Sequence, residues 1–149
     1  MKKVIHKADT RGRSRYDWLD SHHTFSFDEY FDSERINFGA LRVLNDDRVA
    51  PGEGFQTHPH KNMEIVSIPL KGKLEHGDSK KNNRVITVGD IQVMSAGTGI
   101  FHSEMNGSKT EPVEFLQIWI MPRERNTHPA YNDYFFPFCL FARFLRISA

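Results

Sequence analysis

Two short stretches of the sequence each carry two side chains that can bind metal, spaced two residues apart. THPHKNMEIVS holds His58 and His60 on either side of a proline, and SAGTGIFHSEMN holds His102 and Glu104. Alternate residues of a β-strand point to the same face, so each pair can converge on one point if its segment is extended. Three imidazoles and a carboxylate suit one borderline divalent metal such as Fe(II), with Mn, Ni, Cu and Zn as alternatives.

Each pair also has an interpretation that involves no metal. His58 and His60 could be loop residues solvated around Pro59, and His102 with Glu104 could be a surface pair that caps a turn. These interpretations leave unexplained why two separate pairs share one spacing and are both flanked by glycines. Glycines let the backbone turn sharply and let a ligand approach closely. The metal interpretation is therefore preferred.

The elements that must position these pairs are predicted to be short strands, because runs rich in Val, Ile and Phe alternate with turn-forming residues. The expected strands are TFSF at 24–27, FGALRVL at 38–44 before an Asn-Asp-Asp turn, MEIVSIPLKG at 63–72, RVITVGD, IQVMSAG, and VEFLQIWIMP at 113–122. Pro69 predicts an edge strand or a bulge. Many short strands with regular turn signals are typical of an antiparallel sandwich or small barrel, so the fold is predicted to be all-β.

The composition limits the function classes. A chain of 149 residues is about one domain by length. Its formal net charge of +1 gives no electrostatic argument for binding nucleic acid or an anionic membrane surface. The single cysteine, Cys139, cannot form an internal disulfide. No apolar run has the length of a secretory signal or a membrane-spanning helix, so a cytoplasmic protein is expected.

Several longer motifs resemble the pirin family. DSHHTFSF, FGALRVLNDD, GFQTHPHKNMEI, LEHGDS, MSAGTGIFHSEMN and LQIWIMP together are similar to the amino-terminal domain of pirins, especially the bacterial members. The resemblance extends from about residue 6 to Phe136. The spacings after Gly52 and Gly99 also resemble the two motifs of the wider cupin superfamily, with Gly97 where the second motif has a proline.

The resemblance implies a single cupin-type antiparallel β-barrel or jelly roll, which is half of a bicupin. It implies a metal held by His58, His60, His102 and Glu104, with Glu64 beside these ligands or as an alternative ligand. It further implies a pirin-type quercetinase, which opens a flavonol ring with dioxygen and loss of carbon monoxide. Glu104 is then the first candidate for the base that takes the flavonol proton, and Glu64 is the second. Other pirin-like proteins are described as nuclear iron-dependent cofactors of transcription factors, so an iron-binding regulatory module without enzymatic activity, or an inactive fragment, stays open.

Other polar and aromatic residues receive simpler interpretations. Candidate walls for a flat aromatic substrate are Phe38, Phe55, Met63, Met94 and Phe101, although ordinary core positions are the preferred interpretation for most of them. His22, His23 and His76 are expected to form local hydrogen bonds. Arg42 and Asp46 are expected to serve a structural ion pair or a turn.

The end of the chain departs from the resemblance. YFFPFCLFARFLRISA contains five of the twelve phenylalanines and no acidic residue. We expect residues 1–136 to form the cupin domain and residues 137–149 to be an atypical Phe-rich tail, with the second cupin domain absent. The tail is predicted to dock on the barrel as a short helix or to pair two chains as a homodimer. A truncated or frame-altered gene and a natural single-domain form both account for such an end.

Overall fold

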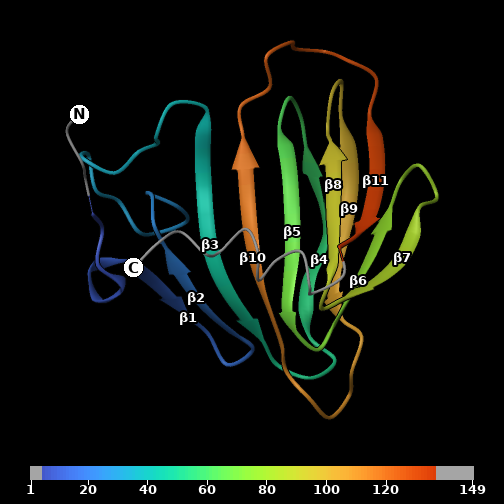
Figure 1. Ribbon diagram of the computed structural model, residues 1–149, viewed down its shortest axis with the longest axis horizontal. Helices are drawn as coiled ribbons and strands as arrows, with labels where there is room; N and C mark the ends of the chain where they lie inside the picture. Colours follow the sequence, from blue (N-terminus) through green and yellow to red (C-terminus); the bar gives the residue numbers. More distant parts are fainter. Residues whose placement is uncertain (1–4, 137–149) are drawn as a thin grey trace.

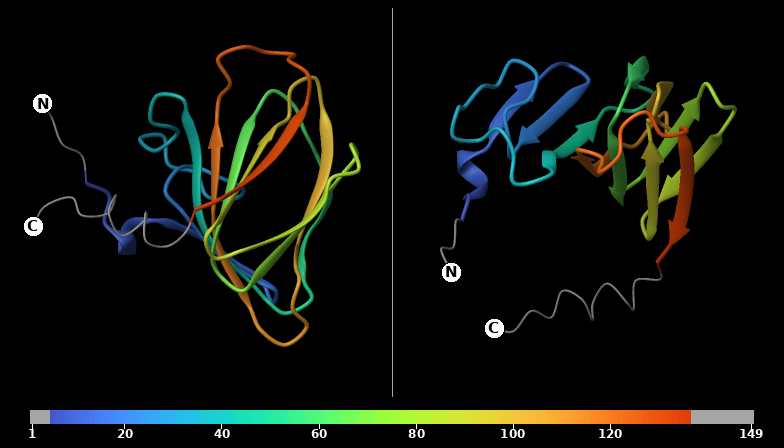
Figure 2. Two further views of the ribbon diagram at one scale, coloured as in Figure 1. Left: turned by 45° about the vertical axis from the view of Figure 1, so that its right-hand side comes forward. Right: turned by 90° about the horizontal axis from the view of Figure 1, so that it is seen from above.

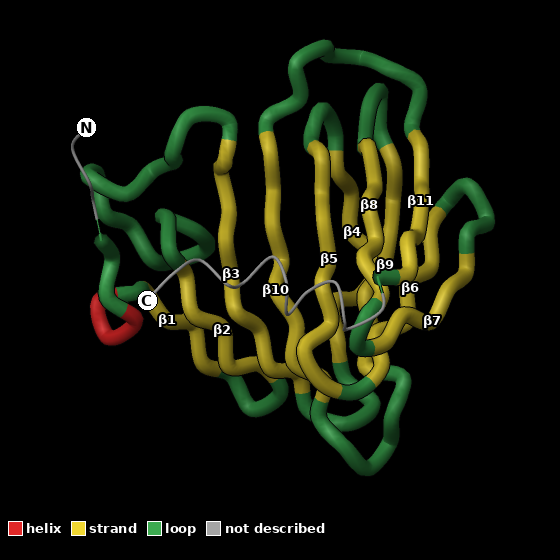
Figure 3. Tube along the Cα trace, viewed as in Figure 1, coloured by secondary structure: helices red, strands yellow, loops and turns green. Residues whose placement is uncertain are grey.

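The computed structural model describes residues 5–136 of the protein. Apart from one turn of 3-10 helix, η1 (Ala8–Thr10), the regular elements of these residues are all strands (Figure 3). The strands are β1 (Gly12–Arg15), β2 (Leu19–His23), β3 (Leu41–Val49), β4 (Gly54–His60), β5 (Glu64–Lys71), β6 (Lys73–Asp78), β7 (Asn83–Thr87), β8 (Asp90–Ser95), β9 (Ile100–Asn106), β10 (Val113–Ile120) and β11 (Ala130–Phe135). The predicted all-β fold is confirmed.

Two antiparallel sheets face each other. The larger sheet has the order β1-β2-β3-β10-β5-β8-β11, and the smaller has the order β4-β9-β6-β7. The smaller sheet lies behind the half of the larger sheet that contains β5, β8 and β11, whereas β1 and β2 extend to one side (Figures 1 and 2). The two segments predicted to bind metal, β4 and β9, are neighbours in the smaller sheet.

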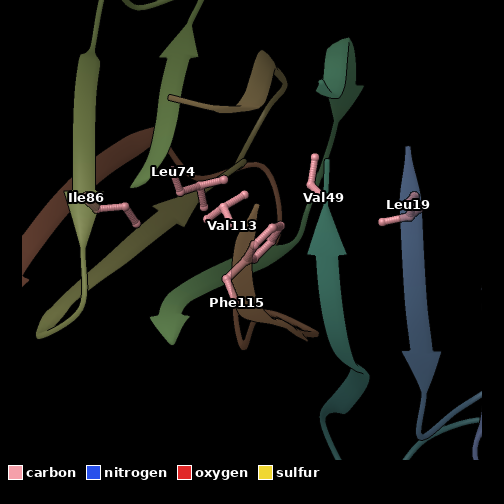
Figure 4. Close-up of a cluster of buried hydrophobic side chains, with 6 residues drawn as sticks. All are labelled: Leu19, Val49, Leu74, Ile86, Val113 and Phe115. Carbon is pink, nitrogen blue, oxygen red and sulfur yellow. The ribbon is translucent and has the colours of Figure 1, made fainter. Parts of the chain in front are cut away.

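The hydrophobic core between the sheets has two parts. The first cluster draws side chains from both sheets and comprises Leu19, Val49, Leu74, Ile86, Val113 and Phe115 (Figure 4). The second comprises Ile65, Met94, Ala96 and Ile100. Fully burying one such side chain stabilises the fold by roughly 1.5–3 kcal/mol. The two clusters therefore hold the sheets together.

A row of polar side chains crosses the larger sheet. Strand register places opposite one another, from β2 to β8, the buried residues His23, Asn45, Gln117, Ser67 and Gln92. Each faces the interior, where an unpaired polar group costs free energy. The inner face of a sheet that serves only as core usually carries apolar residues. This buried row therefore indicates an interior that accommodates polar groups.

One strand prediction and one turn prediction in the first third of the chain are wrong. Residues 24–27 are not a strand: β2 ends at His23, and Phe27 forms an isolated bridge with Tyr30. Asp28 then adopts a positive φ of 52°, which leaves the extended region. The predicted Asn-Asp-Asp turn is also absent from the described chain, since β3 continues to Val49. Pairing with β2 and β10 here overrides the turn propensity of the residues.

The region of Pro69 behaves as a bulge. The register between β5 and β10 shifts between Glu114 and Phe115, opposite the segment from Pro69 to Lys71. Strand β8 pairs with β5 over 64–67 and leaves Pro69 beyond its pairing, so the missing N–H removes no bond to β8. The predicted bulge is confirmed, and β5 is an inner strand of the sheet.

Some sequence predictions concern residues outside the described range. The Phe-rich tail at 137–149, its docking as a helix or in a homodimer, and Cys139 all lie there. Within residues 5–136, no helix has the length and apolarity needed to cross a membrane.

Candidate metal centre

A bulge in β4 sets the direction of its two histidines. The register passes from Phe55 opposite Glu104 to His58 opposite His102, so β4 contains one residue more than β9 over this span. The two residues between Phe55 and His58 are both exposed, whereas Phe55, His58 and His60 are half-buried. A bulge re-aims the side chains that follow it. Here it brings Phe55 to the same side of the strand as the histidines.

The bulge also fixes the proton of the first histidine. Nδ1 of His58 lies 2.7 Å from the backbone oxygen of Gln56. A carbonyl oxygen can only accept, so Nδ1 of His58 carries the proton and donates it. The lone pair of this imidazole is then on Nε2, which is free to bind a metal.

The three predicted histidines converge. One ring nitrogen from each of His58, His60 and His102 lies within 4.8 Å of the other two. Their ring centroids are 4.5–4.8 Å apart. Nε2 of His60 and both ring nitrogens of His102 are buried without a hydrogen-bond partner among residues 5–136. Buried polar atoms are normally paired, and a cation bound by one nitrogen of each ring would satisfy Nε2 of His60 and one of the two nitrogens of His102. The residues present therefore fit a divalent metal.

Burial keeps two of these rings neutral. Burial, together with the charge of the neighbouring histidines, lowers the pKa of His60 to about 4 and that of His102 to about 2. A histidine must be neutral to offer its lone pair to a metal. Both rings are therefore ready to bind a metal at neutral pH.

These shifts predict a pH dependence of stability. In the unfolded chain His60 and His102 titrate near 6.5, so between pH 6.5 and about 4 the unfolded state binds more protons than the folded state. The free energy of unfolding of the metal-free protein should fall as the pH falls through this window, and less steeply in His102→Ala. Urea unfolding in the presence of a chelator at several pH values measures both slopes. An equal pH dependence of the unfolding free energy in wild type and in His102→Ala would contradict the lowered pKa of His102.

Glu104 lies in the buried interior beside the histidines. Its carboxylate accepts a hydrogen bond from Ser67 Oγ at 2.6 Å and another from Gln117 Nε2. Burial raises the pKa of Glu104, and the hydrogen bonds from Ser67 and Gln117 oppose that shift. Its oxygens do not belong to the group of atoms within 4.8 Å of one another that the three histidines form in the described chain. Glu104 therefore stays a predicted fourth ligand.

Glu64 lies apart from this arrangement. It begins β5, is half-buried, and accepts a hydrogen bond from Ser95 Oγ. It is not among the residues that line the cavity next to the histidines. Its predicted role as an alternative ligand or base stays a prediction, and Glu104 is better placed for it.

A cavity of about 330 Å³ opens beside the histidines. Its lining combines His58, His60, Glu104 and Gln117 with the apolar side chains of Trp18, Leu19, Phe27, Phe55 and Trp119 and with a polar group formed by Ser14, Tyr16, Ser21, His23, Asp28, Asn45 and Asp47. The ring of Trp119 packs edge-on against His60, with centroids 4.8 Å apart. This volume is within the range of small-molecule sites.

The predicted cavity walls are partly wrong. Phe55 lines the cavity and Met63 lines a smaller adjoining one, while Met94 is ordinary core. Phe38 and Phe101 are 78% and 55% exposed, so they belong to neither wall nor core. Sequence reasoning missed Trp18 and Phe27 as walls. Phe27 was omitted because the sequence placed it on a strand, whereas it lies in a loop beside the cavity.

Hydrogen bonds are formed by two of the three histidines for which they were predicted, His23 and His76, whereas the hydrogen bond expected for His22 stays a prediction. His23 is buried, with Nε2 at 2.9 Å from Ser14 Oγ and Nδ1 at 2.9 Å from Asn45 Oδ1. His76 lies 3.2 Å from Asp78, and its ring centroid is 5.4 Å from that of His102.

Arg42 and Asp46 have structural partners. Arg42 donates to the backbone oxygens of Ser26 and Ile36, and Asp46 forms an ion pair with Arg11. The structural role predicted for Arg42 and Asp46 is confirmed.

Comparison with known proteins decides the family. The family model described as Pirin matches residues 4–120. The chain belongs to the pirin family. Quercetin 2,3-dioxygenase of Escherichia coli K12 is 51% identical over 129 residues, which are 87% of this chain and 56% of that protein. The chain thus spans about half the length of this pirin-family relative.

Solved structures of similar proteins agree with the fold. The crystal structure of the bacterial pirin YhhW from Escherichia coli in complex with nickel(II) gives a TM-score of 0.85 at 50% identity, over 88% of this chain and 57% of that one. GK1651 from Geobacillus kaustophilus gives a TM-score of 0.68 at 28% identity, over 83% of this chain and 48% of that one. The predicted cupin-type fold is confirmed.

A glycine lets the two histidine-bearing strands, β4 and β9, of this pirin domain approach each other closely. A Cβ at Gly54 would overlap the backbone oxygen of Glu104 and would lie 2.6 Å from Met105 Cα. Gly54→Ala should therefore push β4 away from β9, destabilise the fold by about 1–3 kcal/mol and weaken metal binding. Thermal unfolding and a metal titration measure both effects.

The matched control is Gly52→Ala. Gly52 has a positive φ of 73°, but a Cβ there meets nothing within 4 Å. This variant carries backbone strain without the collision, so its metal affinity should stay near that of the wild type. A Gly54→Ala protein with wild-type metal affinity would show that the close approach of the strands is not needed.

Proposed function

We propose that the chain is the metal-bearing domain of a dioxygenase that opens the ring of a flavonol with dioxygen. The observation that carries the proposal is a cavity of about 330 Å³ with His58, His60 and Glu104 together in its wall. A relative at 51% identity is named quercetin 2,3-dioxygenase, and quercetin is a flavonol. The reaction of the longer relative is thereby carried to this shorter chain as a hypothesis.

The walls of the cavity suit a flat aromatic ligand. Trp18 and Phe55 pack edge-to-face with centroids 5.2 Å apart, and Phe27 packs in the same way against Trp119 at 5.3 Å. Rigid aromatic side chains provide apolar contact area for a planar ring system. Excluding water from such a site strengthens every polar interaction inside it.

His58, His60 and His102 would hold the metal, and Glu104 would complete the set. We propose Fe(II) as the native ion, although Mn, Ni, Cu and Zn also suit three imidazoles and a carboxylate. The YhhW structure contains nickel(II), which supports a divalent ion in general. When bound, a divalent metal supplies Lewis acidity toward the flavonol 3-hydroxyl.

Glu104 is proposed as the base that takes the proton of the flavonol 3-hydroxyl. Each carboxylate oxygen has two acceptor sites, so the hydrogen bonds from Ser67 and Gln117 leave capacity toward the cavity. Burial raises the pKa of Glu104, which makes its carboxylate a better proton acceptor. Ser67 and Gln117 would hold the carboxyl in place throughout.

Turnover of quercetin tests the proposal. The protein is loaded with Fe(II) or Ni(II), mixed with quercetin in air, and followed by the loss of flavonol absorbance together with the release of carbon monoxide. We expect both signals at equal rates and neither in metal-free protein. Metal binding without turnover would contradict the enzymatic proposal and would favour a metal-dependent binding protein.

A further inference from the structure

The reaction proposed above leaves one wall of the cavity without a role. Five buried side chains line the cavity from three neighbouring strands, and we refer to them as the polar wall: Ser14, Ser21, His23, Asn45 and Asp47. The strand register places Ser14 opposite Ser21, and Ser21 opposite Asp47. Buried polar groups destabilise a protein unless they are paired. The polar wall therefore calls for an explanation beyond core packing.

Hydrogen bonds join the polar wall to the mouth of the cavity, which is formed by the exposed lining residues Tyr16 and Asp28. Nδ1–H of His23 donates to Asn45 Oδ1, and Nε2 of His23 accepts from Ser14 Oγ, each at 2.9 Å. Burial lowers the pKa of His23, so the ring is neutral and carries one proton. That proton is the one on Nδ1, which is donated to Asn45. At one end of the series Ser21 donates to Asp47, and burial raises the pKa of Asp47 to about 7, with a smaller contribution from the charge of Glu104. Asp47 and Glu104 line the same cavity.

Asp28 lies at the opposite end of this series. Its Oδ2 accepts a hydrogen bond from Tyr16 OH at 3.0 Å and lies 3.4 Å from Ser14 Oγ. The hydroxyl protons of Tyr16 and Ser14 are therefore engaged, by Asp28 and by His23. What the mouth of the cavity still offers is the acceptor capacity of the Asp28 carboxylate.

The carboxylate of Asp28 has no other interaction partner among residues 5–136. It forms no ion pair within this range, and its Oδ1 accepts no hydrogen bond there. The side chain is exposed and lines both the main cavity and the smaller one beside it. Its backbone has a positive φ of 52°, a conformation that costs free energy and occurs often at ligand sites. A carboxylate that only accepts suits a ligand that donates O–H groups.

We propose that Asp28 is a specificity-determining residue that binds the hydroxyl groups a flavonol carries away from its 3-hydroxyl. The inference rests on the proposed function, because the 3-hydroxyl must face the histidines for the remaining hydroxyl groups to reach the mouth. A polyhydroxylated flavonol would gain a charge-assisted hydrogen bond to Asp28. A flavonol without further hydroxyl groups would occupy the apolar part of the cavity alone.

A structural role for Asp28 makes a different prediction. If the carboxylate merely braces the loop through Tyr16, its loss would weaken the binding of every ligand alike. Asn is the suitable replacement, since it tolerates positive φ and can still accept from Tyr16 through its amide oxygen. Asp28→Asn therefore keeps the brace and removes the charge from the acceptor.

The matched control is Glu29→Gln. Glu29 is the next residue, is exposed, and does not line the cavity. Its replacement removes the same formal charge from the same loop. A change in long-range electrostatics alone would appear equally in Glu29→Gln and in Asp28→Asn.

The experiment compares two ligands in three proteins. Quercetin and 3-hydroxyflavone, which has no further hydroxyl group, are titrated without oxygen into nickel-loaded wild type, Asp28→Asn and Glu29→Gln. Tryptophan fluorescence reports binding, because Trp18 and Trp119 line the cavity. We expect wild type and Glu29→Gln to prefer quercetin, and Asp28→Asn to reduce this preference about tenfold or more, the usual effect of losing a charged hydrogen bond.

The outcomes separate this inference from the proposed function. A preference that is unchanged in Asp28→Asn, or an equal loss of affinity for both ligands, would overturn the role of Asp28 even if quercetin is oxidised. A preference that falls in Asp28→Asn while no flavonol is oxidised would support Asp28 and overturn the dioxygenase proposal. Failure of wild type to bind either ligand would overturn both.

Discussion

Replacing His58 and His102 together with alanine is expected to weaken divalent-metal binding by at least about 100-fold, since losing a residue that merely orients a ligand already costs 10–100-fold. The two residues lie opposite each other on β4 and β9, so the variant removes one imidazole from each strand. His60 would then be the one histidine left in the group. Metal content after dialysis, measured by elemental analysis, gives the result.

The control for this variant replaces two histidines outside the group. His22→Ala with His128→Ala removes the same number of imidazoles, and neither residue belongs to the converging set. This control should retain its metal. Full metal occupancy in the His58→Ala, His102→Ala protein would overturn the assignment of the site.

Glu104→Gln is expected to lower flavonol turnover per bound metal by about 10²–10⁴-fold, the usual effect of losing a general base. The amide has nearly the same shape, and its oxygen can still accept from Ser67. It cannot take a proton from the flavonol at neutral pH. Turnover must be divided by metal content, because Glu104 is also the predicted fourth ligand.

Glu64→Gln is the matched comparison for Glu104→Gln. Both variants replace a carboxylate by an amide, but Glu64 does not line the cavity, so its loss should change turnover little. The reverse result, with Glu64→Gln inactive and Glu104→Gln active, would assign the proton transfer to Glu64.

Sequence periodicity predicted the direction of the ligand pairs because a strand alternates strictly. His102 and Glu104 are both buried on β9, with exposed or half-buried residues between and beside them, as that alternation requires. The bulge in β4 was not predictable in the same way. Nothing about Gln56 or Thr57 as residue types marks an extra position, because a bulge is a property of two paired strands.

The polar wall was missed because its residues look like turn residues in the sequence. Asn45 and Asp47 favour turns by propensity, yet both are buried in the middle of β3. Their partners Ser21 and His23 come from a strand far away in the sequence, and local patterns contain no information about such pairing. The same limit placed a strand at 24–27, where the chain instead turns at Asp28.

The central claim, that three histidines on β4 and β9 hold one metal, is tested most directly by anomalous diffraction. Crystals of the nickel-loaded protein should show one strong anomalous peak per chain, roughly 2.0–2.2 Å from a ring nitrogen of each of His58, His60 and His102. Such a peak would also reveal whether Glu104 completes the set. A peak elsewhere, or imidazoles that point away from a common centre in the loaded protein, would contradict the account.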